Sequence, residues 1–203
     1  MKKRVNLISL CTIITMLLQL SCSPKDKKDE AAKMEMSDAK TTEPTQTEIM
    51  PFEGVDQSVK TQINGFLSDY LTLNQALIED SQDGAKVAGK KLSETVNKFD
   101  MSKLAGEQMD FYHTQQAKLT KSLQGISESA DIEETRLELA IISESMYALV
   151  KAYHPNESEL YYQFCPMAKN GDGASWLSNT KEIINPYMGQ RMLACGRTQE
   201  TLN

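Results

Sequence analysis

The chain has 203 residues and a formal net charge of −6, with 22 Lys and Arg against 28 Asp and Glu. Because no basic excess is available to displace phosphate counterions, we exclude a nucleic-acid-binding protein. The acidic balance instead gives a weak preference for cations.

The first 21 residues predict a secretory signal peptide. Basic residues 2–4 precede a mostly apolar run, residues 5–20, that is too short for a membrane span. Cys22 follows, as in bacterial lipoproteins, although Gln19 stands where the usual pattern has Leu. We expect Cys22 to be lipid-modified and to anchor the protein in the bacterial cell envelope, at the outer membrane. An ordinary cleaved signal with a stray cysteine is the alternative.

Cleavage would remove three positive charges and no negative ones, so the mature chain would carry a net charge of −9. It would also leave Cys165 and Cys195 as the two unmodified cysteines of an exported protein, in an oxidising compartment where disulfides persist. Residues 22–51 are polar, contain three prolines and show no apolar period, which predicts a disordered tether.

Apolar residues then recur at helical spacing four times between residues 52 and 153. The first apolar stripe runs from Val55 to Leu77, the second from Ala85 to Phe99, the third from Met109 to Ile126 and the fourth from Ile132 to Tyr153. Short turns between the stripes predict an antiparallel four-helix bundle.

The pattern changes after Pro155, where Gly, Pro and Cys residues interrupt the apolar content. We expect residues 156–203 to be ordered loop and short helical turns, with a short extended piece at 160–164, packed across the bundle. The predicted fold class is therefore all-α: a four-helix bundle with an irregular C-terminal segment, together one domain at residues 52–203.

Two sulfur-containing motifs in this segment are candidates for chemistry. Cys165-Pro166-Met167 and Met192-Leu193-Ala194-Cys195 each place a thioether two or three residues from a thiol. Thiolate and thioether ligands select Cu(I) over hard cations. We predict a metal site formed by Cys165, Met167, Met192 and Cys195, with His113, which flanks the third apolar stripe, as a fifth participant.

The segment also resembles a known family. The stretches that carry the resemblance are Tyr162–Ala168, Gly173–Ser178, Ile184–Tyr187 and Gly189–Gly196, with Tyr70–Leu77 and Asp131–Arg136 upstream. They resemble domain of unknown function 3347 over roughly residues 60–200. That family occurs as stand-alone bacterial lipoproteins and as C-terminal domains of periplasmic adaptors in copper- and silver-type efflux. The resemblance implies copper handling and an efflux or envelope partner, although Phe164 replaces a residue that is often polar, frequently His.

A disulfide between Cys165 and Cys195 is the competing interpretation, and it would stabilise the fold by about 3–4 kcal/mol in the chain-entropy treatment. Two hypotheses therefore stay open: a lipid-anchored Cu(I)-binding protein, and a disulfide-stapled module that docks on a partner and binds no metal. The two are not exclusive, because a bridge that opens on reduction would release the thiols. No Cys-x-x-Cys, nucleophile-elbow, His-Glu-x-x-His or phosphate-loop motif is present, so we do not expect an enzyme.

Overall fold

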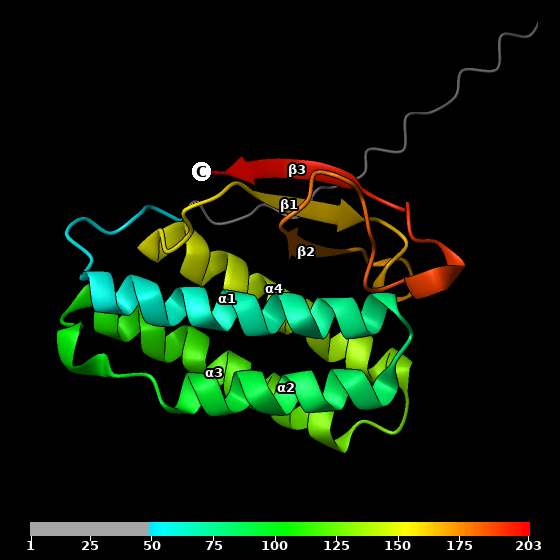
Figure 1. Ribbon diagram of the computed structural model, residues 1–203, viewed down its shortest axis with the longest axis horizontal. Coiled ribbons are helices and arrows are strands. Elements are labelled where there is room, and N and C mark those ends of the chain that lie inside the picture. The colour runs from blue at the N-terminus through cyan, green and yellow to red at the C-terminus, as the bar shows by residue number, and fades with distance from the viewer. Residues whose placement is uncertain (1–48) are drawn as a thin grey trace, which may run out of the picture. The chain divides into compact units, whose positions relative to one another are not determined.

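Four helices followed by a small sheet make up residues 49–203, the part of the chain that the computed structural model describes (Figure 1). The predicted signal peptide, Cys22 and most of the predicted tether lie outside the described residues. The helices are α1 (Gln57–Ile78), α2 (Gln82–Asn97), α3 (Glu107–Glu128) and α4 (Ile132–Tyr153), and the strands are β1 (Leu160–Cys165), β2 (Ala174–Ser178) and β3 (Arg197–Leu202). Single 3-10 turns lie at Met101–Lys103, Lys169–Gly171 and Gly189–Arg191.

Side-chain caps fix the helix starts. Asp56 and Ser81 accept hydrogen bonds from backbone N–H groups in the first turns of α1 and α2. At α4, Asp131 caps the first turn, and Glu134 accepts the N–H of Ala130 at 2.7 Å. His154, with a left-handed φ of 48°, ends α4 just before a proline. The predicted boundaries of the fourth helix are therefore confirmed.

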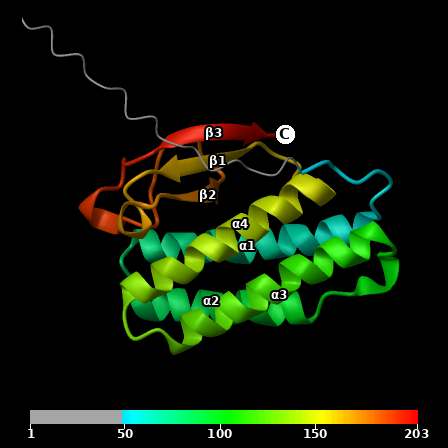
Figure 2. The ribbon, with the colours of Figure 1, turned by 180° about the vertical axis from the view of Figure 1, so that it is seen from behind.

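The apolar stripes predicted from the sequence form the core. Most of their residues are buried, from Val59, Ile63 and Phe66 on α1 to Met146, Leu149 and Tyr153 on α4. Helix α4 is buried on most of its circumference, because it contacts α1 and α3 on one side and β2 on the other. It is therefore the central element between the bundle and the sheet, as Figures 1 and 2 show.

The prediction of a purely all-α fold is wrong in its C-terminal part. Residues 160–202 contain an antiparallel three-stranded sheet of order β2-β1-β3. The extended piece expected at 160–164 is the central strand, whereas the two edge strands were expected to be loop. Both edge strands are only five or six residues long, and β3 pairs with a strand more than 30 residues earlier, so local periodicity carries little signal for them.

Polar side chains of the bundle attach the sheet. The Tyr70 hydroxyl accepts the backbone N–H of Leu177 at 3.1 Å, and Asn74 donates to the Leu177 carbonyl at 3.1 Å. Tyr70 also shares a 2.8 Å hydrogen bond with Ser143 of α4, which in turn accepts from Tyr187 at 3.2 Å. All five residues are buried, so strand β2 is fixed to α1 and α4 by hydrogen bonds that water cannot replace.

Arg136 of α4 makes the second attachment, and its side chain is only 5% exposed. Its guanidinium donates to the carbonyls of Pro186 and Leu77, each at 3.0 Å, and to the carboxylates of Asp80 at 2.5 Å and Glu133 at 2.9 Å. The hydrogen bond from Arg136 also lowers the pKa of Asp80. One buried cation therefore joins the end of α1, the start of α4 and the C-terminal segment.

We predict that Arg136→Lys lowers the free energy of unfolding by about 3 kcal/mol, because one ammonium cannot reach all these acceptors and leaves buried carbonyls unpaired. Arg191→Lys is the matched control, since Arg191 binds the same Glu133 carboxylate at 2.8 Å but is 62% exposed. That change should cost less than about 1 kcal/mol. Urea unfolding measures both, and equal losses would contradict the central role of Arg136.

Candidate functional site

The two cysteines of the C-terminal segment lie side by side, 30 residues apart in sequence. Cys165 ends β1 and is fully buried, and Cys195 is half-buried in the loop before β3. Their Sγ atoms are 2.6 Å apart, and both are free thiols in this structure. A disulfide needs about 2.05 Å, so a shift of roughly half an ångström separates this pair from a bridge.

The Asn185 side chain holds the loop that carries Cys195. Asn185 is fully buried, and its amide donates to the Cys195 carbonyl at 2.7 Å. Its side-chain oxygen accepts the backbone N–H groups of Tyr187 at 2.8 Å and Met188 at 3.1 Å. One buried amide thus fixes the positions of Cys195 and Met188 relative to each other.

Gly196 allows the chain to pass close to β1 directly after Cys195. Its φ is 144°, and a Cβ atom there would lie 2.9 Å from the Phe164 carbonyl oxygen and 2.9 Å from the Trp176 ring. Neither neighbour is a flexible chain end, so a side chain at this position would push Cys195 away from Cys165.

We predict that Gly196→Ala destabilises the protein by at least about 1 kcal/mol more than Gly171→Ala does. Gly171 is the matched control because its φ of 100° is also strained for Ala, yet a Cβ there would meet nothing within 4 Å. Urea unfolding followed by the emission of Trp176, the single tryptophan, measures the difference. Equal losses at the two positions would show that the close approach of Gly196 is not a constraint.

The environment of Cys195 disfavours its thiolate. Burial raises the pKa of the Cys195 thiol to about 11, and the hydrogen bond and negative charge of Cys165 add to this. The backbone N–H of Met167 bonds to the Cys195 sulfur and opposes the rise. A thiol with a pKa of about 11 is neutral at physiological pH.

We predict that alkylation of Cys195 in the reduced folded protein keeps accelerating toward about pH 11, because the rate follows the thiolate fraction. An unperturbed cysteine levels off above its pKa of about 8.5. Peptide mapping by mass spectrometry after brief alkylation at stepped pH values measures this. A rate that is already constant at about pH 9.5 would contradict the shift.

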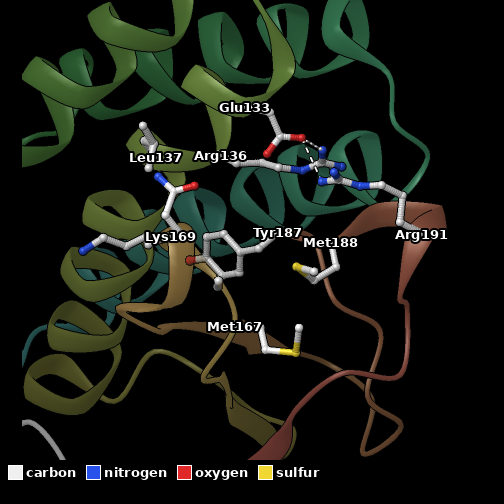
Figure 3. A pocket seen from close by; sticks show the side chains of 10 residues that line it. Glu133, Arg136, Leu137, Met167, Lys169, Tyr187, Met188 and Arg191 are labelled. Atoms are coloured by element: carbon white, nitrogen blue, oxygen red, sulfur yellow. Dashed lines mark hydrogen bonds and ion pairs between the residues drawn. The ribbon is translucent and has the colours of Figure 1, made fainter. Parts of the chain in front are cut away.

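Two methionines line a pocket of about 210 Å³ beside this site. Met167 and Met188 project into the same space in Figure 3, between the start of α4 and the C-terminal segment. The other residues around it are Glu133, Arg136, Leu137, Ala168, Lys169, Asn170, Tyr187 and Arg191.

Of the predicted metal-site residues, Met167 lines this pocket, and Cys165, Cys195, Met192 and His113 do not. Met192 makes a backbone turn with Cys195, but its side chain is 42% exposed and does not line the pocket. His113 is exposed on α3, in the layer of the bundle away from the sheet (Figures 1 and 2). The structure therefore brings Cys165 and Cys195 together. The backbones of Met167 and Met192 both bond to Cys195, while their side chains are 53% and 42% exposed, and His113 is not brought to the thiols.

Within residues 49–203, no group of three or more His, Cys, Asp or Glu side chains could hold a metal ion. None of the helices in the same residues is long and apolar enough to cross a membrane.

The fold and site define a helical-bundle protein whose C-terminal sheet carries an adjacent thiol pair. A family model described as protein of unknown function (DUF3347) matches residues 66–158, from within α1 to just beyond α4, which supports the family resemblance of the sequence. The match ends before Cys165, so it covers the bundle and not the cysteine pair. Neither the curated proteins nor the solved structures contain a match.

Sequence reasoning did not single out Arg136, Asn185 or Met188 as determinants of the site. Arg136 and Asn185 lie in the stretches that carry the family resemblance, but nothing in their local pattern shows which backbone groups they bind. A polar residue between apolar neighbours, such as Asn185 between Ile184 and Pro186, is the one signal that suggests a buried hydrogen-bonding role.

Proposed function

We propose that this protein is a binding protein, not an enzyme, and that its reduced Cys165 and Cys195 thiols bind a soft metal ion, foremost Cu(I), with Met167 as a neighbouring thioether. The observation that carries the proposal is the 2.6 Å approach of two sulfurs, one at the end of a strand and one in a loop, 30 residues apart. Soft sulfur donors favour Cu(I) over Mg, Ca or Mn, and the absence of a His or carboxylate cluster in residues 49–203 is compatible with a sulfur site.

The two cysteine sulfurs could bind one metal ion if one of them moved. With metal–sulfur bonds of about 2.3 Å, two sulfurs on one ion lie about 3.7–4.6 Å apart, so the pair must open by more than about 1 Å. Cys165 ends a strand and is fully buried, whereas Cys195 is half-buried in a loop. Cys195 is therefore the residue that moves, and it opens toward solvent, the side from which an ion arrives.

The cellular setting belongs to the same proposal. Lipid on Cys22 would hold the protein at the outer membrane of a bacterial envelope, with the predicted tether between anchor and bundle. The efflux association implied by the family resemblance makes a metal-efflux adaptor, or another envelope protein, the expected partner. A protein in that position would capture or relay Cu(I) for efflux or storage.

A disulfide-stapled interaction module is the second candidate. The short sulfur–sulfur distance and the raised pKa of Cys195 both favour it, because oxidation needs only a small shift and the Cys195 thiol does not readily become the thiolate that binds a metal ion. In that case the bridge would fasten the start of β3 to the end of β1, and the sheet would serve as a docking surface. The two candidates differ in whether a metal binds, so one experiment separates them.

We predict that the purified reduced domain binds about one Cu(I) per chain, and that the Cys165→Ser and Cys195→Ser variants lose this binding. Thiol counting with and without reductant comes first, followed by Cu(I) titration against a chromophoric chelator. His113→Ala is the control, and it should bind as the parent does because α3 lies away from the sheet.

Circular dichroism and thermal unfolding establish that each serine variant is folded before its titration is interpreted. Serine variants that are folded and bind Cu(I) as tightly as the parent would refute the metal proposal. Absence of Cu(I) binding by the reduced parent, together with a large stability loss in both serine variants under oxidising conditions, would favour the stapled module.

A further inference from the structure

We infer that the pocket of about 210 Å³ at the start of α4 binds a small organic monoanion, namely a carboxylate that carries an apolar group. Neither cysteine lines this pocket, so the inference is independent of the proposed metal site. It gives a role to Lys169 and Arg191, which the proposed function does not use.

The charges around the pocket leave one positive charge in excess. Three cationic side chains line it, those of Arg136, Lys169 and Arg191, together with the carboxylate of Glu133. Asp80 lies behind the lining, where it binds Arg136, and its lowered pKa keeps it ionised at neutral pH. Three positive charges against two negative ones leave a surplus of one, in a chain whose net charge is −6. A bound monoanion would neutralise this surplus.

The Arg136 guanidinium has one hydrogen-bond donor left to offer. A guanidinium carries five N–H groups. Nε donates to the Pro186 carbonyl, and one hydrogen of Nη1 donates to Glu133. Both hydrogens of Nη2 are used, by the Leu77 carbonyl and by Asp80. The second Nη1 hydrogen has no acceptor within residues 49–203, although the side chain is only 5% exposed. Because buried donors are normally paired, this pocket-lining group favours a ligand that supplies an acceptor.

Lys169 and Arg191 can contact a ligand from the rim. Lys169 makes no ion pair within residues 49–203, and Arg191 is 62% exposed with Glu133 as its ion-pair partner. Lys169 and Asn170 have left-handed φ values of 52° and 58°, an unfavourable conformation that clusters at ligand sites. In Figure 3 the Lys169 ammonium extends away from the arginines. Rotation of its flexible stem would bring it over a bound anion.

The rest of the wall is apolar. Leu137 and Met167 are 44% and 53% exposed, and Tyr187 and Met188 line the same space (Figure 3). Large apolar side chains left exposed together around a pocket are typical of a binding site. An apolar cavity of about 150 Å³ holds benzene, so this pocket has room for a ring or short chain with one carboxylate.

Methionine methyl NMR on the purified, unmutated protein tests the inference. With 13C-labelled methyl groups, benzoate should shift the resonances of Met167 and Met188 and leave that of Met50, which does not line this pocket, in place. Benzamide has the same ring without the charge and should bind about tenfold more weakly or worse. Inorganic phosphate should also bind more weakly, because it has no apolar part. No shift at tens of millimolar benzoate, or equal affinity for benzamide or phosphate, would overturn the inference.

Charge variants then locate the anion. Lys169→Gln should weaken benzoate binding about twofold to fivefold, the effect of one exposed ion pair. Lys91→Gln is the matched control and should change nothing, since Lys91 is 72% exposed and pairs with Asp69 outside the pocket. Glu133→Gln should strengthen binding by a similar factor, because a competing negative charge is lost while an amide oxygen still accepts from the arginines.

Unchanged thermal unfolding establishes that these variants are folded. Equal effects of Lys169→Gln and Lys91→Gln, or weaker benzoate binding by folded Glu133→Gln, would refute an anion site in this pocket. Either result would leave the proposed metal function untouched, because that function is tested by the cysteine variants.

Discussion

The burial of the Arg136 guanidinium is the constraint on which the C-terminal half of this structure depends. A charge removed from water must be paired and fully hydrogen-bonded, and the acceptors that meet this need come from three separate segments. The end of α1 supplies Leu77 and Asp80, the first turn of α4 supplies Glu133, and the C-terminal segment supplies the Pro186 carbonyl. The loop that follows residue 186 is therefore held at one end of the bundle, where it forms a wall of the methionine pocket.

Several residues in the stretches that carry the family resemblance attach the C-terminal segment to the helical bundle. Tyr70 holds strand β2 through the Leu177 N–H and Asn185 holds the loop of Cys195. Tyr187 bridges the two by donating to Ser143 of α4, which also bonds to Tyr70, and to the Ser175 carbonyl at 2.7 Å. A three-stranded sheet of five- and six-residue strands buries too little surface to fold alone. Buried hydrogen bonds to the helices stabilise the sheet, so Cys165 and Cys195 lie together only while the sheet is docked on the bundle.

The bundle could be predicted from sequence because helical periodicity is local. Each apolar stripe indicates by itself which face of its helix is buried. The edge strands could not, since β3 is largely exposed and polar and pairs with a strand more than 30 residues earlier. Sulfur spacing suggested that Cys165 and Cys195 meet, and the structure places them together. We included His113 in the predicted metal site because it flanks the third apolar stripe. Periodicity, however, does not determine which helices the C-terminal segment covers. The segment lies over α1 and α4, and His113 belongs to α3.

Under the two candidate functions, the loop that carries Cys195 would determine whether the two thiols form a disulfide or bind a metal ion. Close contact of Gly196 with the Phe164 carbonyl and Trp176 fixes the chain immediately after Cys195, and Arg136 and Asn185 fix it before Met188. Between these two anchors lies the turn that carries Cys195, so opening of the thiol pair is confined to this short piece of backbone. Under the two candidate functions, disulfide formation and soft-metal binding would be alternative closures of one loop, and the redox state of the thiols would select between them.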